Sequence, residues 1–337
     1  MQHCATAAVP ATSAAAAHQD GVQLAANSHA PGLAIAVVRG KRMVWSDAIG
    51  AADIATNAPV TIDTDFRIGS VTKLLTATLF AKLVARGVVH LDDPASRYVP
   101  ELTNANITLG QLAQHLSGIR HYGRSDYMNT QHYDGVSAAL PKFINDPLVA
   151  APGEKYTYSS YGYNLLGAAL ERATKTPFDE LLAREVLRPF GMRHTFREPP
   201  ANARVVKFYD RDDKGALSES PAVDLSDRIP SGAYLSTAGD LARFVSGVLA
   251  LPPATRTLLF TSGKTSAGKE TNVGLAWRLA TDDRGRAYVH HGGDAVGGRA
   301  FVLVYPRENI GVVILGNLSF ARIGEKDAQQ LAAHFLP

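Results

Sequence analysis

The chain has 337 residues, of which 46% are hydrophobic and 19% are charged, a composition typical of a globular protein long enough for about two domains. A formal net charge of +3 without a long run of Lys or Arg argues against a nucleic-acid-binding surface, and no apolar run approaches the ~18 residues of a membrane-spanning helix. The single cysteine, Cys4, excludes an intrachain disulfide and a metal cluster held by thiolates.

The N-terminal segment, residues 1–20, is expected to be a disordered tail or the remnant of a secretion signal. Its beginning, MQHCATAAVPATSAAAA, is built of small residues and is low in complexity. Cleavage sites of the A-x-A kind occur there, although the charged start and the apolar stretch of a signal are missing. Export, to the periplasm or the medium, is the corresponding expectation.

Strand patterns occur near both ends of the chain. The stretch GLAIAVVRGKRMVWSDAIG, residues 32–50, predicts a β-hairpin that turns at Arg39-Gly40-Lys41. Three further strands are predicted near the other end, with short links that favour antiparallel neighbours: 286–291, 299–306 and 310–317. Neither group makes a large sheet alone. We therefore predict an α/β fold of the α+β type, with one five-stranded antiparallel sheet built from both chain ends.

The middle of the chain has a helical pattern. Helices are predicted at 70–86, 108–116, 134–146, 159–173, 177–188 and 237–250, and a last one at 325–335. The predicted organisation is a sheet domain of residues 21–80 and 205–337, flanked by helices. A mainly helical domain of residues 81–204 is inserted between its two parts.

The first predicted helix carries a lysine on an apolar face. A helix advances about 100° per residue, so Thr78, Lys82 and Arg86 share one stripe, which is the natural solvent face. Lys73 lies about 180° away from that stripe, on the same face as Ser70. Burial of an unpaired ammonium is costly, so such a lysine loses its proton or finds partners. A neutral Lys73 would be able to accept the proton of Ser70.

The pattern Ser-x-x-Lys is weak by itself. A second copy, Ser266 to Lys269, lies in the polar, glycine-containing stretch TSGKTSAGKE, and about one match is expected by chance in a chain of this composition. The helical phase alone leaves an ordinary alternative open, in which Ser70 caps the helix and Lys73 extends along the surface.

A cluster of tyrosines precedes another predicted helix, in PGEKYTYSSYGYNLLG (residues 152–167). A tyrosine beside a lysine can pass a proton to a leaving group, which makes Tyr158 a candidate acid–base group. The alternative is that the rings of Tyr156, Tyr158, Tyr161 and Tyr163 simply pack together, with Ser159 or Ser160 as the helix cap.

The stretch HHGGDAVGG, residues 290–298, follows a predicted strand. Glycines there allow another backbone to approach closely, and the backbone N–H groups of Asp294 and Ser70 together could form an oxyanion hole. The alternative is a glycine-rich turn. Adjacent strand residues point to opposite faces, so His290 and His291 should point apart. We therefore expect no metal site at these histidines. No cofactor of another kind is expected either.

The order of the three motifs resembles the penicillin-recognising serine hydrolases of the class C β-lactamase type. That group includes class C β-lactamases, D-alanyl-D-alanine carboxypeptidases, family VIII esterases and the mitochondrial β-lactamase-like peptidase. The resemblance covers about residues 30–320. The segments that carry it are FRIGSVTK, ITLGQLAQHLSGI, PGEKYTYSSYGYNLLG, LRPFGMRHT, GAYLSTAGDLARF and HGGDAVG.

The resemblance implies a role for each motif residue. Ser70 is then the acylating nucleophile, Lys73 its proton acceptor or electrostatic activator, and Tyr158 a second base and proton shuttle. The substrate would be bound by four residues, namely Ser160, His291, Gly293 and Asp294.

Two positions differ from the commonest family pattern. Ser160 replaces an asparagine, and a hydroxyl has less reach and fewer donors than a carboxamide. His291 replaces a lysine, so the grip on a substrate carboxylate should be weaker and pH-dependent. Both differences argue against an efficient β-lactamase. The segments YSSYGYNLLG and HGGDAVG are more similar to the mitochondrial β-lactamase-like peptidase and its bacterial relatives, and this resemblance implies a serine hydrolase of amide or ester bonds, in the first place a peptidase acting on D-amino-acid or other peptides. A carboxylesterase, a weak β-lactamase and a low-turnover penicillin-binding sensor or scaffold are the alternatives, and in each case the partner is a small molecule or a peptide.

Overall fold

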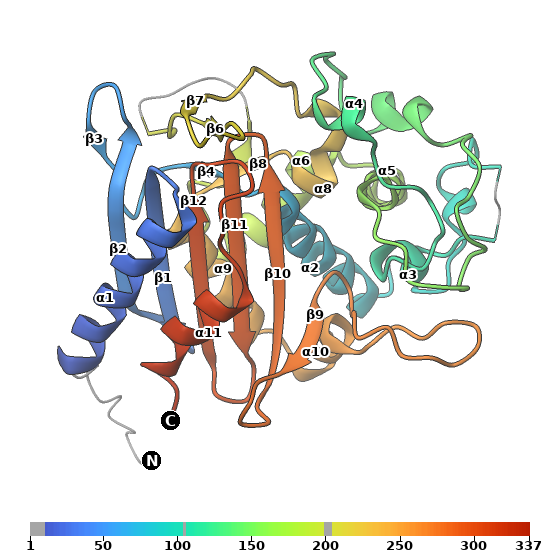
Figure 1. Ribbon diagram of the computed structural model, residues 1–337. Coiled ribbons are helices and arrows are strands. Elements are labelled where there is room, and N and C mark those ends of the chain that lie inside the picture. Colours follow the sequence, from blue (N-terminus) through green and yellow to red (C-terminus); the bar gives the residue numbers. More distant parts are fainter. Residues whose placement is uncertain (1–10, 104–105, 199–203) are drawn as a thin grey trace.

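The structure is a computed structural model, and it describes residues 11–103, 106–198 and 204–337. Within these ranges, both ends of the chain contribute to one antiparallel sheet of seven strands, in the order β3-β2-β1-β12-β11-β10-β9 (Figure 1). The strands are β1 (Gly32–Arg39), β2 (Arg42–Asp53), β3 (Ala58–Pro59), β9 (Arg278–Thr281), β10 (Ala287–Ala295), β11 (Gly298–Tyr305) and β12 (Ile310–Gly316). The predicted joining of the two ends is confirmed, because β1 pairs with β12 along its whole length.

The predicted count of five strands is too low. The two additional strands are β3 and β9, and both lie at the edges of the sheet. β3 has only two residues, and β9 (sequence RLAT) is partly exposed without an alternating apolar pattern. Such short edge strands are held by backbone pairing with a neighbour, so their own sequence carries little signal.

Helices cover both faces of the sheet. On one face lie α1 (Ala11–Ser28) and α11 (Glu325–Ala333), the blue and red helices in front of the strands in Figure 1. On the other face α9 (Ala238–Leu249) packs against β1 and β12. Successive residues of β1 alternate between the two cores, so that Ile35 faces α1 and α11 whereas Ala36 faces the opposite core.

The expectation of a disordered tail over residues 1–20 is wrong for residues 11–20, which form the first half of α1. The alanines there are strong helix formers. Ala17 is fully buried, and Asp20 accepts a hydrogen bond from Gln330 of α11 and lies 2.6 Å from a ring nitrogen of His334. These contacts come from the far end of the chain. Residues 1–10 lie outside the described ranges.

The remaining helices lie beside the sheet and behind it. The longer ones are α2 (Thr72–Ala85), α5 (Ser160–Thr174) and α10 (Pro253–Phe260), and the shorter ones are α3 (Leu109–Ala113), α4 (Arg124–Tyr127), α6 (Phe178–Leu182), α7 (Arg188–Phe190) and α8 (Ile229–Gly232). Two small sheets are built from β4 (Phe66–Arg67), β8 (Tyr234–Ser236) and β5 (Phe196–Arg197), and from β6 (Tyr209–Arg211) and β7 (Leu217–Glu219). All strands of the main sheet fall within residues 21–80 and 205–337, and the domain division itself stays a prediction.

Two local predictions need correction. The segment 134–146 contains only a short 3₁₀ helix, Ser137–Lys142, because Pro141 lacks the N–H that a longer helix requires. The predicted solvent stripe of α2 is largely covered: Thr78 is fully buried, and Lys82 and Arg86 both bind Glu185 from the helical turn at 183–187. The charged side chains on this face predicted that it would be exposed to solvent, but the helical turn at 183–187 packs over it.

Candidate active site

Ser70 lies on a short 3₁₀ turn, η1 (Gly69–Val71), that leads directly into α2. This turn packs against β10 at very close range. A Cβ atom on Gly69 would lie 2.4 Å from the carbonyl oxygen of Asp294, and Gly69 has a φ of +47°, which side chains other than glycine rarely adopt. Glycine at position 69 therefore brings the nucleophile turn onto the edge of the sheet.

Lys73 is fully buried, as the helical phase predicted. Its Nζ lies 3.0 Å from Ser70 Oγ, 2.8 Å from Ser160 Oγ and 2.9 Å from the carbonyl oxygen of Ser231 in α8. Burial lowers the pKa of Lys73 well below 10.5, and the nearby positive charge of Arg228 lowers it further. The alternative of a lysine extending along the surface is therefore wrong.

Tyr158 also reaches the nucleophile, and its hydroxyl donates to Ser70 Oγ at 2.8 Å. Burial raises the pKa of Tyr158, which keeps the phenol protonated near neutral pH. Its ring packs against the imidazoles of His115, at a centroid distance of 4.5 Å, and His121, at 5.2 Å. The acid–base role and the ring packing are the two alternatives for Tyr158, and its contacts are of both kinds, because its ring packs against two imidazoles and its hydroxyl bonds to Ser70.

Three neutral histidines surround these groups. Burial is the largest cause that lowers the pKa of His115, His121 and His291, to about 4 for His121. His115 Nδ1 accepts the N–H of Ser159 and His121 Nδ1 accepts the N–H of Ser160. Because a backbone N–H can only donate, the remaining proton of each ring is on Nε2.

Sequence reasoning gave no role to His115 or His121. His115 lies in a segment that carried the family resemblance, and His121 follows two residues after that segment ends. The signal that could have found them is the position of two histidines at the end of the helix predicted at 108–116 and shortly after it. Their contact with the tyrosine motif, about forty residues later, depends on the tertiary fold.

Strand β10 brings His291, Gly293 and Asp294 to the same place. The strand continues through Ala295, so the alternative of a glycine-rich turn from residue 290 is wrong. His290 packs on the face covered by α11, 3.5 Å from Glu325, whereas His291 lies near Tyr158 at a centroid distance of 6.2 Å. The predicted separation of the two histidines is confirmed.

The backbone at Gly293 and Asp294 lies against the nucleophile turn. A Cβ atom on Gly293 would come within 2.1 Å of the carbonyl oxygen of Ile68 and 3.0 Å of the Ser70 nitrogen. The Asp294 carboxylate forms an ion pair with Arg299 at 2.6 Å. A role for Asp294 through its backbone N–H, paired with that of Ser70, stays a prediction that this proximity supports.

Ser160, predicted to bind substrate, is fully buried, and its hydroxyl oxygen accepts a hydrogen bond from Lys73. The groups within hydrogen-bond distance of Ser70 Oγ and Lys73 Nζ are Tyr158 OH, Ser160 Oγ and the carbonyl oxygen of Ser231, and they come from two other segments of the chain.

The second Ser-x-x-Lys copy is not buried, because Ser266 and Lys269 are exposed on a surface turn.

An open pocket of about 400 Å³ leads to Ser70. It is lined by Ser70, His121, Tyr122, Gly123, Arg124, Tyr127, Tyr158, Arg278, His291, Gly292, Asp294 and Phe320. The guanidinium of Arg278 lies 6.0 Å from the Tyr158 ring centroid. Arg278 belongs to the edge strand β9, which the sequence did not reveal.

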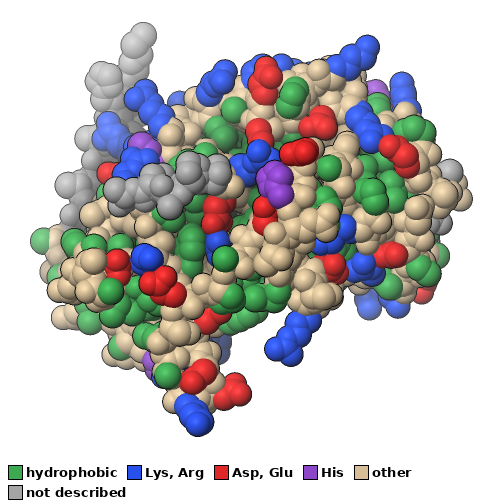
Figure 2. Space-filling view, turned by 90° about the horizontal axis from the view of Figure 1, so that it is seen from above, with side chains coloured by type: hydrophobic (Ala, Val, Ile, Leu, Met, Phe, Trp, Pro, Cys, Tyr) green, Lys and Arg blue, Asp and Glu red, His purple; other side chains and the backbone are tan. Residues whose placement is uncertain are grey.

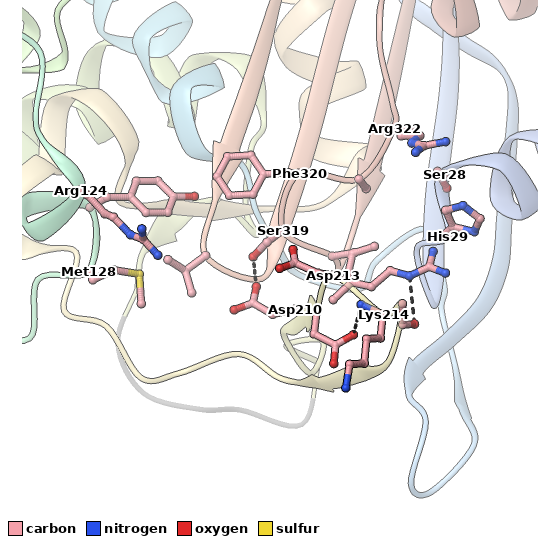
Figure 3. Close-up of a pocket in the computed structure, with 17 residues that line it drawn as sticks. Ser28, His29, Arg124, Met128, Asp210, Asp213, Lys214, Ser319, Phe320 and Arg322 are labelled. Carbon is pink, nitrogen blue, oxygen red and sulfur yellow. Dashed lines mark hydrogen bonds between the residues drawn. The ribbon is translucent and has the colours of Figure 1, made fainter.

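A larger hollow of about 940 Å³ adjoins this pocket and shares Arg124, Tyr127 and Phe320 with it. The close-up of Figure 3 shows Phe320 between Arg124 and Met128 on one side and Ser319 and Asp213 on the other. The side chain of Phe320 is 66% exposed, and its ring lies 5.8 Å from that of Tyr127. The two aromatic rings form the boundary between the hollows.

Charges of both signs are mixed on the face shown in Figure 2, where Lys and Arg side chains stand among Asp and Glu. Within the described ranges, no group of three or more His, Cys, Asp or Glu residues is placed to hold a metal ion. No helix in the described part of the chain is both long and apolar enough to cross a bilayer. The absence of cofactors and nucleic-acid partners stays a prediction.

The close packing at β10 leads to a test. Gly293→Ala should lower kcat/KM by at least about 10²-fold, because the new Cβ must push η1 away from β10 and so misplace the N–H groups next to Ser70. Gly292→Ala is the matched control. Its Cβ would meet only side-chain atoms of Phe301 and Arg299, at 3.3 Å or more, and a loss within about threefold is expected. Steady-state kinetics on a nitrophenyl ester, with a thermal melt of each variant, measures both; equal losses would show that strand packing alone is affected.

Comparison with known proteins shows to which family the sequence belongs. The family model described as Beta-lactamase matches residues 17–334. The chain is 27% identical, over 83% of its length and 69% of the relative's, to "Serine beta-lactamase-like protein LACTB, mitochondrial" from Homo sapiens.

Solved structures share the fold. A class C beta-lactamase superposes with a TM-score of 0.79 at 20% identity and covers 98% of both chains. The octameric penicillin-binding protein homologue from Pyrococcus abyssi superposes with a TM-score of 0.81 at 24% identity and covers 94% of this chain and 75% of its own. The match of the family model over nearly the whole described chain, together with these relatives, shows that the protein belongs to the beta-lactamase family of serine hydrolases.

Proposed function

We propose that this protein hydrolyses amide or ester bonds through an acyl-enzyme at Ser70, with peptides as its main substrates. One observation carries the proposal: Ser70 Oγ lies within hydrogen-bond distance of both Lys73 Nζ and Tyr158 OH. A nucleophile with two proton-handling groups in reach is the arrangement that covalent catalysis requires.

Acylation begins with attack of Ser70 Oγ on the scissile carbonyl carbon, while the serine proton passes to the neutral amine of Lys73. Two other acceptors, Ser160 Oγ and the carbonyl of Ser231, hold the two N–H groups of that amine and direct its lone pair to Ser70. The N–H groups of Ser70 and Asp294 stabilise the negative carbonyl oxygen, and the N-terminus of α2 adds a favourable field.

The tetrahedral intermediate then breaks down. The bond to the leaving group breaks, the leaving group takes the proton of Tyr158, and Lys73 returns its proton to the tyrosine oxygen. A water molecule next attacks the acyl carbonyl carbon and gives a proton to the neutral amine of Lys73. The bond between the acyl carbon and Ser70 Oγ then breaks, and the proton passes from Lys73 to Ser70 Oγ as the acid product leaves. The raised pKa of Tyr158 suits this donor role, because the group is protonated when the leaving group needs it.

The pocket also favours a peptide carboxylate. The resemblance puts His291 where family members carry a lysine, and the lowered pKa leaves His291 uncharged near pH 7. Arg278 lines the pocket with its guanidinium 6.0 Å from the Tyr158 ring centroid, and we propose it as the partner of a substrate carboxylate. Because Arg278 is exposed at the rim, this contact is screened by solvent.

The substrate class is tested with a panel of p-nitrophenyl esters, D-alanyl-D-alanine peptides and nitrocefin. A peptidase should hydrolyse the peptide with the highest kcat/KM and nitrocefin poorly. Intact-mass spectrometry after fluorophosphonate and after penicillin treatment should show one covalent adduct on Ser70. Turnover of esters alone would favour the carboxylesterase, and a stable penicillin adduct without any turnover would favour the sensor or scaffold.

We further propose that the protein is exported and that its partner is a small-molecule or peptide substrate, without a cofactor. The small residues that precede α1, with their A-x-A-like pattern, are the observation that supports export.

A further inference from the structure

His121 stands between the catalytic groups and the pocket opening. It is exposed, lines the same pocket as Ser70 and Tyr158, and packs edge-on against the Tyr158 ring. Its Nδ1 is occupied, because it accepts the N–H of Ser160 at 3.2 Å. The two nitrogens of an imidazole point in roughly opposite directions, so Nε2–H points away from the Ser160 backbone.

The loop that carries His121 is firmly anchored. The guanidinium of Arg120 binds Asp146 at 2.6 Å and Asp126 at 3.2 Å, and the carbonyl of Arg120 accepts the Ser159 hydroxyl at 2.8 Å. Within the described ranges, no protein group bonds to His121 Nε2. A fixed ring therefore presents one unused donor at the edge of the pocket.

Ser160 is poorly suited to contact substrate. Its hydroxyl holds Lys73, and the side chain is fully buried and absent from the pocket lining. If the enzyme acts on peptides, the amide that precedes the scissile bond needs a donor for its carbonyl oxygen, since an unpaired buried carbonyl is costly. The backbone N–H of Ser160 does not supply this donor either, because it already donates to His121 Nδ1 and so orients the His121 ring.

We propose that His121 recognises N-acylated amino acids and peptides, with its Nε2–H donating to the carbonyl oxygen of the substrate's acylamino group. This inference rests on the proposed serine hydrolase function. Although His121 as a whole is exposed, its ring packs against Tyr122 and Tyr158, and this desolvation lowers its pKa to about 4, which keeps the ring neutral and its tautomer constant near pH 7. Recognition should therefore not change between about pH 6 and 8.

A matched pair of substrates isolates the contact. N-acetylalanine p-nitrophenyl ester, in D and L forms, differs from p-nitrophenyl propionate only by the acetamido group. His121→Phe keeps a ring against Tyr158 but removes both nitrogens, and His121→Asn keeps one acceptor and one donor. His132→Ala, at an exposed histidine outside the pocket, is the control, and it should behave as the unsubstituted protein.

His121→Phe should lower kcat/KM for the acetylalanine ester about tenfold more than for the propionate ester, which corresponds to one lost neutral hydrogen bond. His121→Asn should restore most of that ratio. Equal losses on the two esters, or no loss, would overturn the inference and leave His121 as a packing residue. Absence of Ser70-dependent turnover of either ester by the unsubstituted protein would instead overturn the proposed function, and the inference with it.

Discussion

Replacement of Ser70 by alanine should abolish turnover, with a loss of at least about 10³-fold in kcat. Among the residues that the structure describes, no other hydroxyl can take its place, because attack requires an oxygen next to both Lys73 Nζ and Tyr158 OH. The fold should survive, since within the described part of the chain the Ser70 side chain bonds to Lys73 and Tyr158 alone, and the close contact between η1 and β10 is made by backbone. Kinetics on a nitrophenyl ester and a thermal melt measure the two effects.

Ser266→Ala is the matched control for that experiment. Ser266 begins the second Ser-x-x-Lys pattern, but it is exposed on a surface turn together with Lys269. Its replacement should change neither kcat nor the melting temperature measurably. If Ser70→Ala retained activity, or if both variants lost it equally, the assignment of the nucleophile would be wrong.

The second large effect concerns Lys73 and Tyr158, which we expect to act as one proton-transfer unit. Lys73→Arg should be nearly as damaging as Lys73→Ala, because arginine keeps the charge but does not act as a base near neutral pH. Tyr158→Phe removes one hydroxyl and should lower kcat by roughly 10²–10⁴-fold. The double variant should be little worse than either single one, since groups that act together are not additive.

Tyr163→Phe is the control for the loss of a buried phenol. Its hydroxyl donates to the carbonyl of Ala113 and does not contact Ser70, so its removal should cost about 1 kcal/mol of stability while kcat changes little. Full activity in Lys73→Arg together with no effect of Tyr158→Phe would make Lys73 a structural charge and refute the mechanism.

The pKa of Lys73 also determines the expected pH profile. A protonated amine cannot accept the serine proton, so kcat/KM should fall as the pH drops through the lowered pKa of Lys73 and level off above it. This acid limb must lie below 10.5, the ordinary lysine value. The folded state keeps the amine neutral while the unfolded chain binds a proton, so the free energy of unfolding should fall as the pH drops from 10.5 to the lowered pKa of Lys73. Below that pKa this group should change it no further. In the Lys73→Ala variant the acid limb should disappear from the residual rate.

Local patterns predicted a large part of the architecture. The five longest strands of the main sheet, the helices α2, α5, α9 and α11, and the pairing of the two chain ends follow from the alternation and length of apolar segments. The proximity of Ser70 and Lys73 could also be predicted, because residues at i and i+3 share one helical face. The opposite directions of His290 and His291 follow in the same way from strand geometry.

The sequence by itself determined the fold class, the nucleophile–lysine pair and the motif order that indicated the family, since these depend on residues near one another in the chain or on regular periodicity. Only the tertiary structure decided what surrounds that pair. Tyr158 reaches Ser70 across 88 positions, His121 meets Ser160 across 39, and Arg278 enters the pocket on an edge strand without a sequence pattern of its own. Such contacts join segments whose separation no local period encodes, and so burial, pKa values and the free donor of His121 became visible only once the chain was folded.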